Sequence, residues 1–309
     1  MTMRQPSRIK RRLQTLKVTL LVVAGLLGAA GPACAWWNED WSQRTRYALD
    51  TTDKGQPIGE ALTGVPLAIR LHSGNFDFLS AKADGSDLRV LAADDKTVLP
   101  HRLERFDATN ELAVVWVVLP NLAPGSDKNL VYVYAGNDKS AAVAAATGVG
   151  DAAVKLAVGF SDVGAKGLDA VAALQAKVAV TPEPNALLAG GAKLTGAPMA
   201  WAADSLKIAA GAPATLSLWV KTEAGAAGTL LAWGPVSVSL AADGKLSAKV
   251  GTSALAGGSV TAATWTHVAL VLEGAQARLH VNGAEVAKGP AATPELSGEL
   301  RVGADLRGA

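Results

Sequence analysis

Acidic side chains are the first candidates for chemistry in this chain of 309 residues. Two carboxylates facing each other across a groove hydrolyse glycosides, and clustered carboxylates bind hard cations. The close acidic pairs here are Asp84/Asp87, Asp94/Asp95 and Glu104/Asp107. All three have turn-like spacing, so we interpret them as turn-capping residues. Asp84 and Asp87 are also a candidate Ca²⁺ site, although no regular calcium-loop spacing supports it.

The chain has four histidines, His72, His101, His267 and His280. A zinc site needs three or four ligands at short or hairpin-related spacing. His267 and His280 fit a cross-strand pair, but no third ligand is evident, so we predict structural histidines. No Gly-x-Ser-x-Gly motif marks a nucleophile. The sequence therefore predicts a protein without catalytic activity.

Tryptophan is the residue type that most suggests ligand binding, with eight in the chain. Trp201 and Trp233 stand near loops, where an exposed indole face stacks on a sugar ring, and they are our candidate ligand-binding residues. Packing at the rim of the fold is the alternative reading of both. The other strand tryptophans, Trp116, Trp219 and Trp265, lie inside strong strand patterns and are predicted to be core residues.

Short apolar runs separated by turn residues predict an all-β protein. In residues 36–137 the predicted strands are 65–71, 88–91, 112–119 and 130–134. The run 112–119 is apolar on both faces, which is typical of a central strand. These features predict a first antiparallel β-sandwich, followed by an alanine-rich linker at 138–157.

A second antiparallel sandwich is predicted at 158–309, where several runs alternate with a period of two. Asp243-Gly244 and Asn282-Gly283 are dipeptides typical of tight hairpins, because both central residues adopt positive φ. The predicted strands are 215–220, 236–240, 246–250, 265–272, 278–281 and 300–302.

Residues 1–35 have the pattern of a cleaved export signal, with a signal helix before the two sandwiches. Six basic residues and no acid precede an apolar run at 18–30, and Ala33-Cys34-Ala35 supplies small residues at the cleavage site. Such a run spans about 20 Å as a helix, less than the roughly 30 Å bilayer core. We expect cleavage near Ala35 and a periplasmic or extracellular product that begins at Trp36.

Removal of this signal changes the charge and the redox chemistry of the product. The single cysteine lies within the signal, so thiol and disulfide chemistry are excluded from the exported part. The formal net charge changes from +2 to about −4, because all six basic residues of the signal are lost. No basic cluster remains, which argues against a nucleic-acid partner.

The first sandwich resembles a bacterial family classed as domain of unknown function 2341. The resemblance covers about a hundred residues, whose motifs occur in the same order as in the family. It implies a similar fold but no particular reaction. It rests on Trp37, Trp41, Arg44, 76–78, 84–89, 99–101, 103–107, 115–117 and 132–137.

The second sandwich resembles a laminin-G-like, concanavalin-type jelly roll. Trp265-Thr266-His267-Val268-Ala269, followed by the Asn282-Gly283 hairpin, is the most specific part, and 216–220, 243–246 and 299–303 support it. Family members usually continue into one more strand, so we expect this jelly roll to be incomplete at its C-terminus. Concanavalin-type glycosidases usually carry Glu-x-Asp-x-x-Glu on one strand, and this chain has no such spacing.

Proteins that pair these two modules are often similar to biopolymer-transport proton channels of the ExbB/TolQ type. The resemblance implies an exported, non-catalytic binding region for a glycan, an envelope polymer or a protein partner, associated with a proton-channel complex. Two alternatives stay open. One is a concanavalin-type glycoside hydrolase or lyase, and the other is a structural spacer without a ligand.

Overall fold

The computed structural model describes residues 36–141, 153–160, 175–177, 181–194, 197–202 and 204–307. The predicted signal helix and cleavage site at 1–35 lie outside the described residues, as does most of the predicted linker. In the part that is described, the one helical element is a 3₁₀ turn at Asp204–Leu206, and every strand pairing is antiparallel. The predicted all-β class is therefore confirmed.

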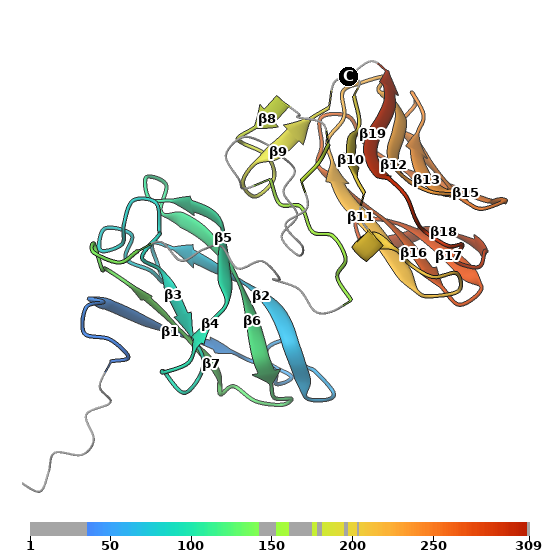
Figure 1. The fold of residues 1–309 in the computed structure, drawn as a ribbon. Coiled ribbons are helices and arrows are strands. Elements are labelled where there is room, and N and C mark those ends of the chain that lie inside the picture. The colour runs from blue at the N-terminus through green and yellow to red at the C-terminus, as the bar shows by residue number, and fades with distance from the viewer. Residues whose placement is uncertain are drawn as a thin grey trace, which may run out of the picture. The chain divides into compact units, whose positions relative to one another are not determined.

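The first sandwich consists of a four-stranded and a three-stranded sheet (Figure 1). The four-stranded sheet has the order β1-β7-β3-β4, and the three-stranded sheet has the order β2-β6-β5. The strands are β1 (Gln43–Leu49), β2 (Leu62–His72), β3 (Arg89–Leu91), β4 (Val98–Leu99), β5 (His101–Asp107), β6 (Leu112–Leu122) and β7 (Asn129–Ala135).

Apolar side chains from both sheets form one core in this sandwich. Leu71 of β2, Val115 of β6 and Val133 of β7 are all fully buried there. β6 lies between β2 and β5, as its apolar pattern predicted. Its two faces differ, because Ala113, Val115, Val117 and Leu119 are buried while the alternate residues, Trp116 included, are half-buried.

The second sandwich consists of a six-stranded and a four-stranded sheet (Figure 1). The six-stranded sheet has the order β10-β19-β12-β13-β14-β15, with strands β10 (Met199–Trp201), β12 (Ala227–Trp233), β13 (Val236–Leu240), β14 (Lys245–Val250), β15 (Ser253–Ser259) and β19 (Leu300–Arg307). The four-stranded sheet has the order β11-β16-β17-β18, with strands β11 (Ala214–Val220), β16 (Thr266–Glu273), β17 (Gln276–Val281) and β18 (Ala284–Pro290).

Period-two alternation gives the four-stranded sheet one buried and one outer face. Leu216 of β11, Leu270 of β16 and Leu279 of β17 point into the core. Thr215, Ser217 and Trp219 of β11 are exposed on the other face. A separate hairpin pairs β8 (Thr181–Glu183) with β9 (Gly191–Lys193). None of the described elements is a helix long and apolar enough to cross a membrane.

Candidate functional site

Trp201 and Trp233, the predicted ligand-binding residues, are buried in the core of the second sandwich. Each ends a strand, and each pairs with Leu300 of β19 from opposite sides. Each has only 2% of its surface exposed. The expectation of an exposed stacking face at these positions is wrong. Their neighbouring loop residues indicated a surface position, but both side chains point to the inner face of the sheet.

Asp84 and Asp87, the candidate calcium ligands, accept hydrogen bonds from backbone amides. Asp84 Oδ1 accepts a hydrogen bond from the Ser86 amide at 3.0 Å, which lowers the pKa of Asp84. Asp87 is fully buried, and its Oδ2 accepts the amides of Gly136 at 2.6 Å and Asn137 at 3.1 Å. Its Oδ1 accepts the Lys82 amide at 3.0 Å.

Four amides therefore occupy the oxygens that Ca²⁺ would need, and this argues against the calcium prediction. The described residues contain no group of three His, Cys, Asp or Glu side chains that could hold a metal ion. His267 and His280 are not directly opposite each other, because the partner of His280 on β16 is Ala269.

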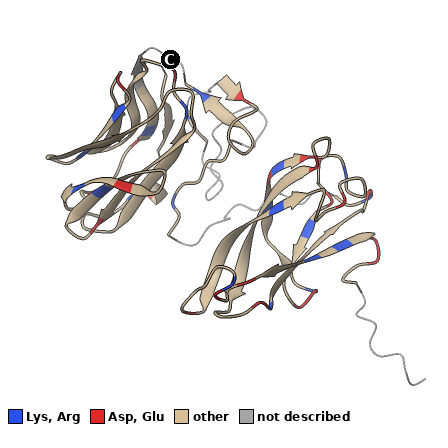
Figure 2. Cartoon of the chain, turned by 180° about the vertical axis from the view of Figure 1, so that it is seen from behind, with Lys and Arg blue, Asp and Glu red and all other residues tan. Residues whose placement is uncertain are grey.

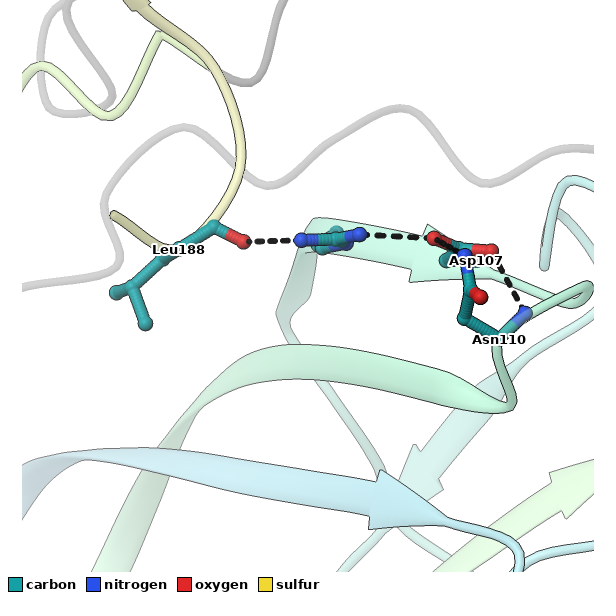
Figure 3. Close-up of polar contacts among 4 residues, drawn as sticks. Asp107, Asn110 and Leu188 are labelled. Carbon is teal, nitrogen blue, oxygen red and sulfur yellow. Dashed lines mark hydrogen bonds and ion pairs between the residues drawn. The ribbon is translucent and has the colours of Figure 1, made fainter. Parts of the chain in front are cut away.

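Asp107 of the third acidic pair is likewise a turn residue (Figure 3). Asn110 donates to it through both its backbone and its side-chain nitrogen, at 3.0 and 2.9 Å. Arg105 Nη2 donates to Asp107 Oδ2 at 2.8 Å, and Arg105 Nη1 donates to the carbonyl of Leu188 at 3.2 Å. Hydrogen bonds from Asn110 and then Arg105 lower the pKa of Asp107 to about 2. Such a carboxylate holds no proton to donate at neutral pH.

An aromatic hollow lies instead on the outer face of the four-stranded sheet, lined by Trp219, Trp265, His267 and Asn282. Its volume is about 460 Å³. Trp219 of β11 and His267 of β16 are cross-strand partners, so their side chains project from the same face. Trp265 precedes His267 by two residues and is on the same side. We call these four residues the aromatic hollow.

Trp219 provides the exposed aromatic surface of this hollow. It is 52% exposed, whereas a core tryptophan is almost completely covered. Its ring centroid lies 5.3 Å from that of His267, and the planes are tilted by 47°. The imidazole therefore supports the indole from one side and leaves much of the ring open to solvent. The prediction that Trp219 is a core residue is wrong.

Asn282 fixes the edge of the aromatic hollow. Its side-chain Oδ1 accepts a hydrogen bond from the backbone amide of His267 at 2.9 Å. The backbone amide of Asn282 donates to the His267 carbonyl at 2.9 Å. These two bonds tie the β17–β18 turn to the start of β16. The amide side chain is therefore held beside the two tryptophans and the histidine by the backbone itself.

Figure 2 shows basic and acidic residues interspersed along the ribbon of both sandwiches. A polar hollow of about 500 Å³ in the first sandwich includes Asn75 and Asp77 in its lining. Asn75 is used internally there, since its Oδ1 accepts the His72 amide and its Nδ2 donates to the Arg70 carbonyl.

Two family models match parts of this chain. Residues 84–169 match the model of a domain of unknown function (DUF2341). Residues 195–309 match a model described as the concanavalin A-like lectin/glucanases superfamily. Both resemblances seen in the sequence are thereby confirmed, whereas the association with proton-channel proteins stays a prediction. No curated protein matches the chain.

The solved structures that this chain matches are distant from it in sequence and in structure. A sialidase of Trypanosoma rangeli is 18% identical, with a TM-score of 0.39 over 65% of this chain and 37% of the sialidase. A candidate carbohydrate-binding protein of Bacteroides ovatus is 9% identical, with a TM-score of 0.27 over 80% of this chain and 70% of that one. Domains LG4-5 of mouse laminin alpha1 are 12% identical, with a TM-score of 0.29 over 85% of this chain and 80% of that one.

Proposed function

We propose that the second sandwich binds a glycan at the aromatic hollow and that the protein acts without catalysis. The observation that carries this proposal is the exposed indole of Trp219, which lies beside the His267 ring on the outer face of the sheet. An aromatic face supplies the apolar contact for the C–H surface of a sugar ring, and neighbouring polar groups orient its hydroxyls. The match to a lectin and glucanase superfamily supports this assignment.

Binding of glycans by the whole protein tests the proposal, with Trp219→Ala as the decisive variant. We expect Trp219→Ala to weaken binding by roughly tenfold, the effect of losing about 1.4 kcal/mol of aromatic contact. Trp36→Ala is the matched control, since Trp36 is also an exposed indole, at 41%, and is not part of the hollow. A glycan array followed by isothermal titration of the positive sugars provides the measurement.

Equal binding by the wild type and Trp219→Ala would contradict the assignment of the site. A flat array would favour the structural spacer. Release of reducing ends from any bound polysaccharide would favour the alternative of a hydrolase or lyase.

The cellular setting of this binding is part of the same proposal. The basic and apolar pattern of residues 1–35 supports export, with the ligand or a protein partner in the cell envelope. The resemblance stated for the pair of modules supports an association with a proton channel of the ExbB/TolQ type. N-terminal sequencing of the protein from its native cells tests the export step, and an intact Met1 on the bulk of the protein would contradict it.

A further inference from the structure

Lys221 brings a positive charge to the aromatic hollow. It follows Trp219 by two residues and comes directly after β11, which ends at Val220. Its Nζ lies 5.5 Å from the centre of the Trp265 ring, within the range of a cation–π contact. The ammonium is therefore held beside the hollow by one of its lining residues.

No acidic side chain neutralises this ammonium among the residues whose placement is known. The lining of the aromatic hollow contains no Asp or Glu. Lys221 takes part in none of the ion pairs between described residues. Glu223, its nearest acidic neighbour in the chain, pairs with Lys193 at 3.6 Å.

The acids of the same sheet are also paired, and with a different base. Arg278 of β17 contacts Glu273 at 3.1 Å and Glu285 at 3.6 Å. One guanidinium thus serves both carboxylates, and neither ion pair includes Lys221. The charge that faces a ligand in the aromatic hollow is consequently positive.

We infer that the aromatic hollow selects saccharides that carry an acidic group, a carboxylate or a sulfate, which Lys221 contacts while Trp219 stacks on the ring. This inference rests on the proposed function and specifies its ligand class. A hydrogen bond between an ammonium and an oxyanion is stronger than one between neutral groups, so the acidic sugar is favoured over its neutral counterpart. Because the contact is solvent-exposed, it weakens as salt shortens the screening length from about 10 Å at 0.1 M.

The test compares acidic oligosaccharides with the same sugars after their charge is removed. One pair is oligogalacturonate and its methyl ester, and a second is a heparin oligosaccharide and its desulfated form. Binding to the wild-type protein, Lys221→Met and Lys288→Met is measured at low salt and at about 0.5 M NaCl. Lys288→Met is the matched control, because Lys288 is an exposed residue of β18, the strand furthest from β11 in the same sheet.

We expect the wild type to prefer at least one acidic form by roughly two- to fivefold at low salt, as one exposed charge pair allows. Lys221→Met removes this preference and its salt dependence, and Lys288→Met retains both. A preference for oligogalacturonate over its methyl ester identifies the acidic group as a carboxylate. A preference for the heparin oligosaccharide over its desulfated form identifies it as a sulfate.

Two other results overturn the inference in distinguishable ways. Equal binding of charged and neutral forms, with both lost in Trp219→Ala, removes the acidic preference and leaves the glycan site in place. Failure of every sugar to bind, or binding unaffected by Trp219→Ala, removes the glycan site and the inference together.

Discussion

His101 of β5 is buried in the first sandwich with both ring nitrogens next to backbone carbonyls. Nδ1 lies 3.0 Å from the Leu99 oxygen, and Nε2 lies 3.1 Å from the Leu88 oxygen. Desolvation by burial is the largest influence and lowers the pKa of His101, while the two carbonyls oppose it and the nearby charge of Arg89 adds to it. The folded protein thus holds this imidazole in its neutral form at neutral pH.

This arrangement predicts a loss of stability on mild acidification. The unfolded chain binds the proton near the ordinary pKa of 6.5, and the folded chain binds it only at lower pH. The free energy of unfolding therefore falls as the pH drops below about 6.5, by no more than about 1.4 kcal/mol per pH unit for one proton. Urea unfolding at several pH values between about 7.5 and 5.5 measures the slope.

His101→Gln serves as the control for that slope, because glutamine has no proton to gain in this range. The variant is expected to be less stable at pH 7.5 and to show a shallower pH dependence than the wild type. An identical slope in both proteins would assign the effect to another group.

The tryptophans show how much of the site could be predicted from residue types alone. The sequence identified tryptophan as the informative residue type, but it predicted Trp265 to be a core residue together with Trp219, whereas Trp265 lines the aromatic hollow. It selected Trp201 and Trp233 because of their loop neighbours, and both are buried. The alternation of Thr215, Ser217 and Trp219 with Leu216 and Leu218 already contained the signal for an outward indole.

At the scale of elements, the β17–β18 hairpin positions Asn282 against the aromatic hollow. Asn282 and Gly283 have φ of +49° and +84°, the positive values that a tight hairpin turn requires. A Cβ at Gly283 would meet no atom within 4 Å, so a substitution there is opposed by backbone strain alone.

We predict that Gly283→Ala lowers the free energy of unfolding by roughly 1 kcal/mol or more, since alanine disfavours this φ. Gly289→Ala is the matched control within β18, because its φ is not positive and its new Cβ would lie 3.8 Å from Leu255 in ordinary contact. The control is expected to be neutral or slightly stabilising in chemical denaturation. Equal effects of both substitutions would contradict the role of the turn conformation.

The strands that the sequence revealed are those with apolar alternation and tight turns. The predicted 236–240 coincides with β13, and the predicted 112–119 lies within β6. β15 was missed because its sequence, Ser-Ala-Leu-Ala-Gly-Gly-Ser, contains one large apolar residue and two glycines. β1 was missed because its polar and basic residues hide the alternation. Pairing with a neighbouring strand, which no local pattern reports, makes both into strands.

At the scale of the whole molecule, the apolar residues form two separate cores. One contains Leu71 in the first sandwich, and the other contains Leu270 in the second, and both side chains are fully buried. Calorimetry is therefore expected to resolve two transitions rather than one, each belonging to one core.

We predict that Leu71→Ala and Leu270→Ala each lower a different transition. Removal of a buried leucine side chain costs about 2–5 kcal/mol through lost burial and the cavity left behind. Thermal unfolding of the two variants and the wild type measures which transition moves. A single transition shifted equally by both variants would show that the sandwiches unfold as one unit.

The place of β19 has a consequence for the order in which the protein is made. β19 lies between β10 and β12 and bonds to both, although it follows them by about seventy residues or more in the chain. A ribosome must therefore release residues 300–307 before the six-stranded sheet can close. The first sandwich uses only β1 to β7, so it can fold before β19 is available, whereas the six-stranded sheet cannot.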